Sequence, residues 1–305
     1  MRQNLLVLTA IGLLSSQISA PGAVSAQQLI AKSDNNTTGV GRTCKVAPLT
    51  KSFNTQYIVP GNELSGSRIA ASPIDKWVLP INGSVVVITE NGQVLAHDID
   101  LARRVVNLPY QLSGPAVAVD PQDKWVFSIG NSIVVVTDSG QAFAYDVDLV
   151  RRTVSAAYQL SGSKVTTDPQ DKWVLPVGGH IVVITQGGQV SVHDIDFARR
   201  IVSSDYQLSG PPVAAYPEDK QVFPLNGSIA LLTDNGQIFV YNIDLSRRIV
   251  RPAREVAGIN GEALQDKRLL SFYQCLTSKR ISSDTILAIT LDGQVFVGIT
   301  AVQIP

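Results

Sequence analysis

The sequence predicts an all-β protein assembled from one repeated unit. Regular spacing within the sequence supports this prediction. Tryptophans recur every 48 residues, at Trp77, Trp125 and Trp173, and turn glycines recur with the same period, at Gly92, Gly140, Gly188 and Gly236. A fixed period of roughly 20–50 residues is typical of solenoids, propellers and arrays. Short apolar runs within each unit are separated by turn residues, and helical periodicity is absent beyond the first 26 residues. We expect a five-bladed β-propeller of 48-residue, mainly four-stranded repeats.

The second copy of the repeat defines the expected strands most clearly. We predict strands over Pro115–Val119, Lys124–Ile129, Ile133–Thr137 and Gln141–Val147. Turn signals separate these runs, including the DPQD segment and a tight turn that ends at the repeated glycine. The segment DLVRRTVSAAYQLSG that follows either crosses to the next unit or adds an outer strand, and the sequence leaves both open.

The third apolar run reads VVVIT, IVVVT, IVVIT or IALLT in successive copies, without polar alternation. A strand of this composition must be covered on both faces. A blade between two neighbouring blades meets this requirement, whereas one face of an open sheet usually meets water. Closed radial repetition also removes the long free edges of a linear stack.

The two chain ends are expected to share the last unit. The fifth copy contains ten additional residues between its landmarks and stops after the run TILAITLDGQVFVGI, where the next segment of the repeat is missing. Residues FNTQYIVPGNELSG near the start align with LARRVVNLPYQLSG and supply that segment, so the N-terminal segment closes the ring. We therefore expect a single domain over 44–305, with units near 64–111, 112–159, 160–207, 208–255, and 256–305 plus 53–63.

The start of the chain has the features of a secretory signal peptide. Residues 1–26 combine a short basic start, an apolar stretch too short to span a bilayer, and small residues before a cut after Ala26. Residues 27–43 are polar and read as a flexible leader. A secreted or periplasmic location follows, without a transmembrane segment. In that oxidising environment we expect a disulfide between Cys44 and Cys275, which the closing segment and the insertion bring to the same unit.

Charge and composition limit the classes of partner. The chain has 25 Lys and Arg against 25 Asp and Glu, charged residues make up 16%, and no basic block stands out. Nucleic acid is therefore not expected as a partner. The hydrophobic fraction of 45% is enough for a sizeable core. We expect a monomer without a cofactor.

Part of the repeat resembles the YVTN and WD families of propeller repeats. The resemblance rests on GPAVAVDPQDKWVF followed by VVVTDSGQAFAYDVD, and it covers about 240 residues. It implies a propeller fold more than an activity, because Gln122-Asp123 replaces the usual Asp-Gly and a terminal Trp-Asp pair is missing. The count of five is similar to that of tachylectin-like sugar-binding propellers, although no ligand motif of theirs carries over.

A repeated Tyr-Gln pair is the candidate ligand-binding feature. Tyrosine is enriched at contact surfaces, and a tyrosine beside an amide is suited to sugars and proteins. The alternative is that the YQLSG segment merely turns into the next blade. The candidate residues are Tyr110, Gln111, Tyr158, Gln159, Tyr206 and Gln207.

Other repeated polar residues are expected to serve the structure. Aspartates, with an asparagine in one case, precede each Arg-Arg pair by three to six residues. The residues are Asp98/Asp100, Asp146/Asp148, Asp194/Asp196 and Asn242/Asp244, before Arg103-Arg104, Arg151-Arg152, Arg199-Arg200 and Arg247-Arg248. They favour local ion pairs over a ring of arginines that binds an anionic glycan. The tryptophans are expected to pack between blades.

Histidines do not indicate a metal centre. His97 and His193 share a repeat position with Tyr145 and Tyr241, which predicts a packed aromatic slot. His180 occupies a position that holds serine in other copies. Close His and Cys ligand spacing is missing, so no metal site is expected.

No catalytic motif stands out either. None of the five glutamates is framed as an acid/base pair, and a G-x-S-x-G elbow is absent. The sequence favours a non-catalytic binding propeller that presents near-equivalent sites to a glycan, a cell-envelope component or a protein. The alternative is a hydrolase or lactonase with a central-channel site in the fifth unit.

Overall fold

The structure of the chain is a computed structural model. The described residues are 56–58, 62–72, 74–120, 122–165, 171–214, 219–225, 227–233, 237–255, 268–275 and 282–302. Over these ranges the chain forms strands and turns without a helix, so the all-β prediction is confirmed. No helix in this part of the chain is long and apolar enough to cross a membrane. The predicted signal peptide, the leader and Cys44 lie outside the described residues.

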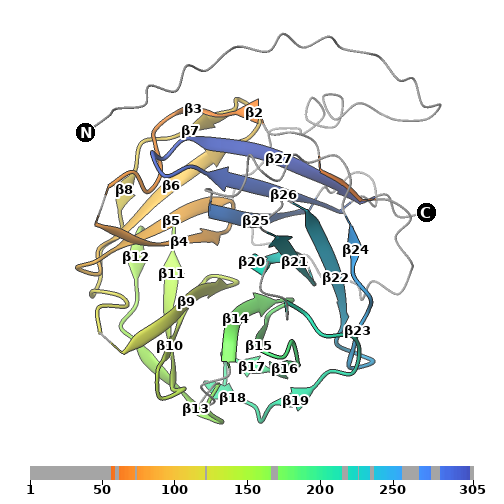
Figure 1. The fold of residues 1–305 in the computed structure, drawn as a ribbon. Coiled ribbons are helices and arrows are strands. Elements are labelled where there is room, and N and C mark those ends of the chain that lie inside the picture. Colours follow the sequence, from red (N-terminus) through yellow and green to blue (C-terminus); the bar gives the residue numbers. More distant parts are fainter. Residues whose placement is uncertain are drawn as a thin grey trace, which may run out of the picture. The chain divides into compact units, whose positions relative to one another are not determined.

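The strands of the described residues form five sheets, and the first three strands of each sheet pair antiparallel (Figure 1). The first strands are β4 (Asp75–Ile81), β9 (Asp123–Ile129), β14 (Asp171–Val177), β20 (Asp219–Leu225) and β25 (Arg268–Cys275). The second strands are β5 (Ser84–Thr89), β10 (Ser132–Thr137), β15 (His180–Thr185), β21 (Ser228–Thr233) and β26 (Ser282–Ile289). The third strands are β6 (Val94–Asp100), β11 (Ala142–Asp148), β16 (Val190–His193), β22 (Ile238–Asp244) and β27 (Val295–Val302).

Each sheet ends in a short outermost strand that pairs with the third strand. These outermost strands are β8 (Tyr110–Gln111), β13 (Tyr158–Gly162), β19 (Tyr206–Gln207), β24 (Arg254–Glu255) and β2 (Asn62–Glu63). Further short strands lie along the connections, namely β1 (Gln56–Ile58), β3 (Ser65–Gly66), β7 (Val105–Val106), β12 (Thr153–Val154), β17 (Ile195–Asp196), β18 (Ile201–Val202) and β23 (Ile249–Val250). The segment whose path the sequence left open therefore contains the outer strand of each sheet.

The expected strand over Pro115–Val119 is wrong. This segment carries no strand, and Ala118 has a φ of 53°, which interrupts an extended backbone. The Val117 amide donates a hydrogen bond to the Gly92 carbonyl of the preceding sheet, at 3.0 Å. The apolar run is thus a connection that packs between sheets, and burial rather than strand pairing accounts for its composition.

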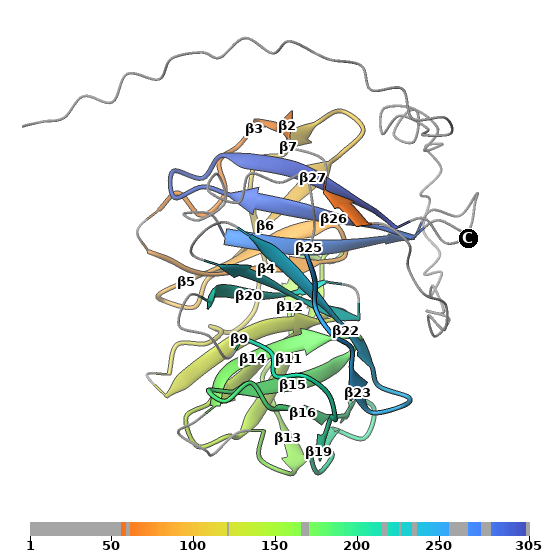
Figure 2. The ribbon, with the colours of Figure 1, turned by 45° about the vertical axis from the view of Figure 1, so that its right-hand side comes forward.

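Successive first strands contact one another in a closed cycle, from β4 through β9, β14, β20 and β25 back to β4. Figures 1 and 2 show the sheets following one another around this cycle in chain order. An arrangement of antiparallel sheets around their first strands is that of a β-propeller.

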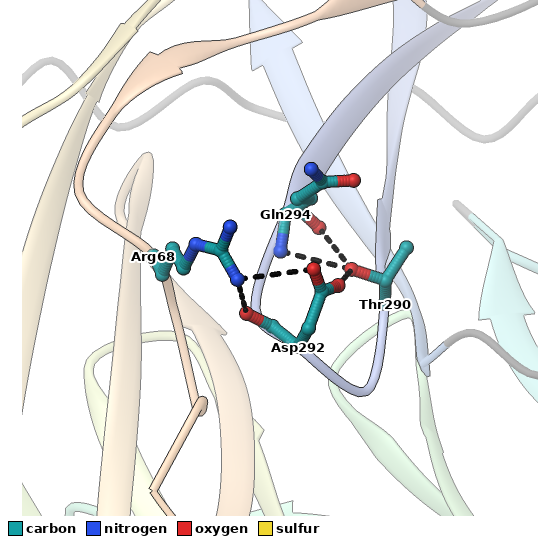
Figure 3. A network of polar contacts seen from close by, with 4 residues as sticks. All are labelled: Arg68, Thr290, Asp292 and Gln294. Carbon is teal, nitrogen blue, oxygen red and sulfur yellow. Dashed lines mark hydrogen bonds and ion pairs between the residues drawn. The ribbon is translucent and has the colours of Figure 1, made fainter.

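The beginning and the end of the described chain meet in one sheet. Strands β1 and β2 both pair antiparallel with β27. The Arg68 guanidinium then donates to the Asp292 carboxylate and to its carbonyl, each at 3.0 Å, in the turn between β26 and β27 (Figure 3). The Ile69 amide donates to the Gly293 carbonyl at 2.9 Å. These contacts join segments more than 220 residues apart in sequence.

The core lies between neighbouring sheets. All six residues of β5, β10 and β21 are buried, which confirms that these strands are covered on both faces. Ile88 of one sheet, for example, belongs to the same apolar cluster as Val126 and Ile133 of the next. Trp77, Trp125 and Trp173 pack against such clusters, as predicted.

Candidate functional site

The predicted Tyr-Gln pairs lie on the outermost strands of three sheets. Their tyrosines are half-buried, whereas their glutamines are exposed. In β8 the pairing places Tyr110 opposite Ala96 and Gln111 opposite Leu95, and β13 and β19 repeat this register. The two members of each pair therefore have different environments.

Each tyrosine hydroxyl donates a hydrogen bond to an aspartate of its own sheet. The acceptor oxygens belong to Asp98, Asp146 and Asp194, at 3.0, 2.9 and 3.4 Å. The second strand supplies a further donor to the same carboxylates, with Ser84 at 2.7 Å and Ser132 at 2.8 Å. The first aspartate of each repeated pair thus organises hydroxyl groups.

Each tyrosine ring is also covered by an arginine of the next sheet. The guanidinium carbons of Arg152, Arg200 and Arg248 lie 4.5 Å from the ring centroids of Tyr110, Tyr158 and Tyr206, respectively. A cation this close to an aromatic face is held by the ring quadrupole. The tyrosine consequently links an aspartate of one sheet to an arginine of the next.

The backbone of that arginine is fixed as well. Arg152 has a φ of 56°, in the left-handed region, and its carbonyl accepts from the Ser113 amide at 2.9 Å. The Ser113 hydroxyl donates to the same carbonyl at 3.1 Å. Behind the serine, Gly114 lies so close to Val154 that an added Cβ would be 2.3 Å from its carbonyl oxygen. The glycine of the repeated Leu-Ser-Gly is therefore required for close approach of the sheets.

Burial, together with the hydrogen bond to Asp98, raises the pKa of Tyr110 to about 12, although Arg152 opposes the shift. Burial raises the pKa of Tyr158 and Tyr206 in the same way. The phenols are neutral donors at physiological pH, and their hydroxyls are engaged within the protein. The exposed glutamines are the candidate residues with side chains at the surface.

The repeated Asp and Arg residues form two different sets of contacts. The second aspartate and first arginine make the local ion pairs that the sequence predicted, with N–O distances of 3.6–3.8 Å for Asp100–Arg103, Asp148–Arg151, Asp196–Arg199 and Asp244–Arg247. The Arg amide also donates to that aspartate at 2.8–3.1 Å. The stacking of the second arginine on a tyrosine was not predicted, because the two lie 42 residues apart.

The histidines occupy structural positions. His97 and His193 are 4% and 3% exposed, which confirms the packed aromatic slot. The ring nitrogens of His193 lie 3.1 Å from the Ser203 carbonyl and 2.9 Å from the Val165 carbonyl. His180 Nδ1 lies 2.7 Å from Asp194. Over the described ranges, no group of three His, Cys, Asp or Glu side chains is placed to hold a metal ion.

One cavity contains a candidate residue. A cavity of about 450 Å³ between the third and fourth sheets is lined by Gln189, Gln207, Ser209 and Pro212, with Val250 of β23 on the side of the fourth sheet. The corresponding glutamines on the two preceding sheets are Gln93 with Gln111 and Gln141 with Gln159, all exposed. The second glutamine of each pair was among the predicted candidates but the first was not, although the first also recurs every 48 residues, directly after the turn glycine.

No family model matches the chain, and no curated protein matches it. Among solved structures, the glutaminyl cyclase of Myxococcus xanthus is 14% identical, with a TM-score of 0.45, covering 82% of this chain and 99% of that chain. BamB from Moraxella catarrhalis is 15% identical, with a TM-score of 0.31, covering 79% of this chain and 88% of its own. A luciferin-regenerating enzyme is 8% identical, with a TM-score of 0.40, covering 75% and 80%.

Proposed function

We propose that this chain is a secreted or periplasmic five-bladed β-propeller that binds a glycan, a cell-envelope component or a protein without catalysis. Five sheets around one cycle of first strands support five blades, and the pairing of β1 and β2 with β27 supports closure by the N-terminal segment. The apolar stretch and small residues near the start support export.

The cavity lined by Gln189 and Gln207 carries the binding proposal. Its volume of about 450 Å³ is within the usual range of small-ligand sites, which is about 300–1,000 Å³. Two amides offer both donors and acceptors, as a sugar hydroxyl requires. Pro212 adds an apolar wall against which a sugar ring can pack.

Recurrence of the glutamine pair supports a repetitive ligand. Equivalent weak sites on one rigid ring raise the overall affinity by about 10²–10⁴ when one ligand reaches several of them. Equivalent glutamine pairs recur on three sheets, with Gln111 and Gln159 on the first two, and this recurrence supports a ligand of that kind.

A glycan array followed by stepwise substitution tests the proposal. We expect Gln207→Ala to weaken binding of the captured glycan and the addition of Gln159→Ala and Gln111→Ala to weaken it further. The melting temperature should not change, because these side chains are exposed. Val150→Ala, at a residue that is 95% exposed, is the control. Unchanged binding in the triple variant, or substrate turnover in a hydrolase screen, would overturn the proposal.

A further inference from the structure

An aromatic side chain lies near the outer edge of the second sheet, beside its pair of glutamines. Phe143 of β11 is half-buried and lies opposite Gln159 of the outermost strand. Residues directly opposite each other on paired strands point to the same face of the sheet. Gln141 lies two residues before Phe143, and residues two apart along an extended chain also share a face. The ring and both amides therefore belong to one surface.

The fourth sheet shows that the two side chains of such a pair reach each other. Its Gln237 Nε2 donates to Glu255 Oε1 at 3.2 Å. These two residues are the repeat equivalents of Gln141 and Gln159. The register is also the same, because Glu255 lies opposite Phe239. The two glutamines of the second sheet are thus placed to contact one small ligand together.

A row of apolar residues leads from the core to this ring. Val126, Val135 and Phe143 lie opposite one another on successive strands, and Gln159 ends the row. The two valines are buried in the apolar cluster between the first and second sheets. Phe143 belongs to none of the apolar clusters formed by the described residues. It therefore lies where the core ends and solvent begins.

The other sheets differ at this position. The equivalents of Phe143 are Leu95, Ser191, Phe239 and Phe296. Serine offers no apolar surface, and the other three side chains pack against apolar clusters. On the fourth and fifth sheets a glutamate, Glu255 or Glu63, also replaces the outer glutamine. Within the described residues, only the second sheet combines an aromatic ring outside the core with two glutamines.

The two glutamine side chains are available to a ligand. Gln141 and Gln159 are exposed, and over the described ranges their side-chain amides form no hydrogen bond within the chain. Each amide offers two donors and one acceptor oxygen. The turn before Gln141 contains an acid, Asp138, but its carboxylate lies 3.8 Å from Lys124 Nζ. The three side chains at this surface are themselves neutral, which suits a neutral ligand with hydroxyl groups.

We propose that Phe143, Gln141 and Gln159 form a stacking subsite for a neutral pyranose with equatorial hydroxyls, of the kind found in β-linked glucose or N-acetylglucosamine chains. The axial C–H bonds of such a sugar form an apolar face that packs on an aromatic ring, while its hydroxyls project from the rim toward the amides. Small-ligand sites commonly combine aromatic surface with a few polar groups that fix orientation. This inference rests on the proposed function and adds the class of sugar and its main contact sheet.

Calorimetric titration of the full chain with cellotetraose and chitotetraose tests the inference, with an α-linked mannotriose as reference. We expect at least one β-linked oligosaccharide to bind, and mannotriose to bind about tenfold more weakly because its axial hydroxyl interrupts the apolar face. Phe143→Ser introduces the residue of the third sheet and should lower the affinity about tenfold. Phe143→Trp should retain binding and give a saccharide-dependent change in fluorescence that the unmodified protein lacks, which a merely structural role would not produce.

The matched control is Phe239→Ser, at the equivalent position of the fourth sheet, which should leave the affinity unchanged. Melting temperatures verify that each variant is folded. Equal affinity of Phe143→Ser and the unmodified protein, or preference for mannotriose over both β-linked oligosaccharides, would overturn the inference. If neither β-linked oligosaccharide binds but Gln207→Ala still weakens binding of a glycan captured on the array, only this inference fails. Binding of no saccharide at all would contradict the glycan form of the proposed function as well.

Discussion

Substitution of Gly162 by alanine is expected to separate two sheets locally. Gly162 has a φ of 104°, and a Cβ at this position would lie 2.2 Å from the Val202 carbonyl oxygen. Neither atom is at the end of a flexible side chain, so the parallel pairing of β13 with β18 must open. The pairing involves hydrogen bonds from the amide of Ser161 at 2.8 Å and that of Ser163 at 3.0 Å.

The expected loss in the free energy of unfolding follows from the groups that the substitution disturbs. Two backbone hydrogen bonds and the Ser161 hydroxyl bond to Arg200, at 3.1 Å, contribute about 1 kcal/mol each. Alanine at this φ adds strain of about 1–3 kcal/mol. We therefore expect Gly162→Ala to lower the free energy of unfolding by about 4–6 kcal/mol and the melting temperature by about 10 °C or more.

Gly130→Ala is the matched control. Gly130 also has a positive φ, 59°, but no atom lies within 4 Å of an added Cβ. Its cost is the left-handed conformation alone, about 1–2 kcal/mol, partly offset by the lower entropy of the unfolded chain. Thermal unfolding followed by tryptophan fluorescence measures both variants. Melting temperatures within about 2 °C of each other would refute the argument from close approach.

Three further predictions concern pH and the chain ends. Burial lowers the pKa of His97, so below about pH 6.5 the unfolded chain takes up the proton before the folded chain does, and the free energy of unfolding should fall between pH 7 and pH 5. The same pH dependence of the melting temperature in His97→Tyr would contradict this. Deletion of residues 27–43 should change the melting temperature little, whereas deletion of 27–60 removes β1 from its pairing with β27 and should lower the melting temperature substantially. Equal melting temperatures of the two truncated proteins would count against closure of the ring by the N-terminal segment. Mass spectrometry of a non-reduced digest should show the peptides of Cys44 and Cys275 linked by a disulfide, which would contribute roughly 5 kcal/mol at most to stability. Two titratable thiols per chain would refute this prediction.

Much of the fold was accessible from the sequence because its signals are local. The apolar run of β10 and the glycine that follows it fix a buried strand and its turn within ten residues. The run at Pro115–Val119 misled for a related reason, since an apolar composition specifies burial and not an extended backbone. The outer strand over Tyr158–Gly162 stayed ambiguous, because pairing at a sheet edge depends on the neighbouring strand.

In the candidate site, too, the sequence predicted the contacts between residues close in sequence and not those between distant residues. Spacing within a turn determined the ion pair between Asp148 and Arg151, whose partners are three residues apart. Only the tertiary structure decided that Tyr110 is engaged by Arg152 and that Gln207 lines a cavity. A period in the sequence states which residues are equivalent, whereas the packing of one sheet on the next decides which equivalent residues meet and which remain at the surface.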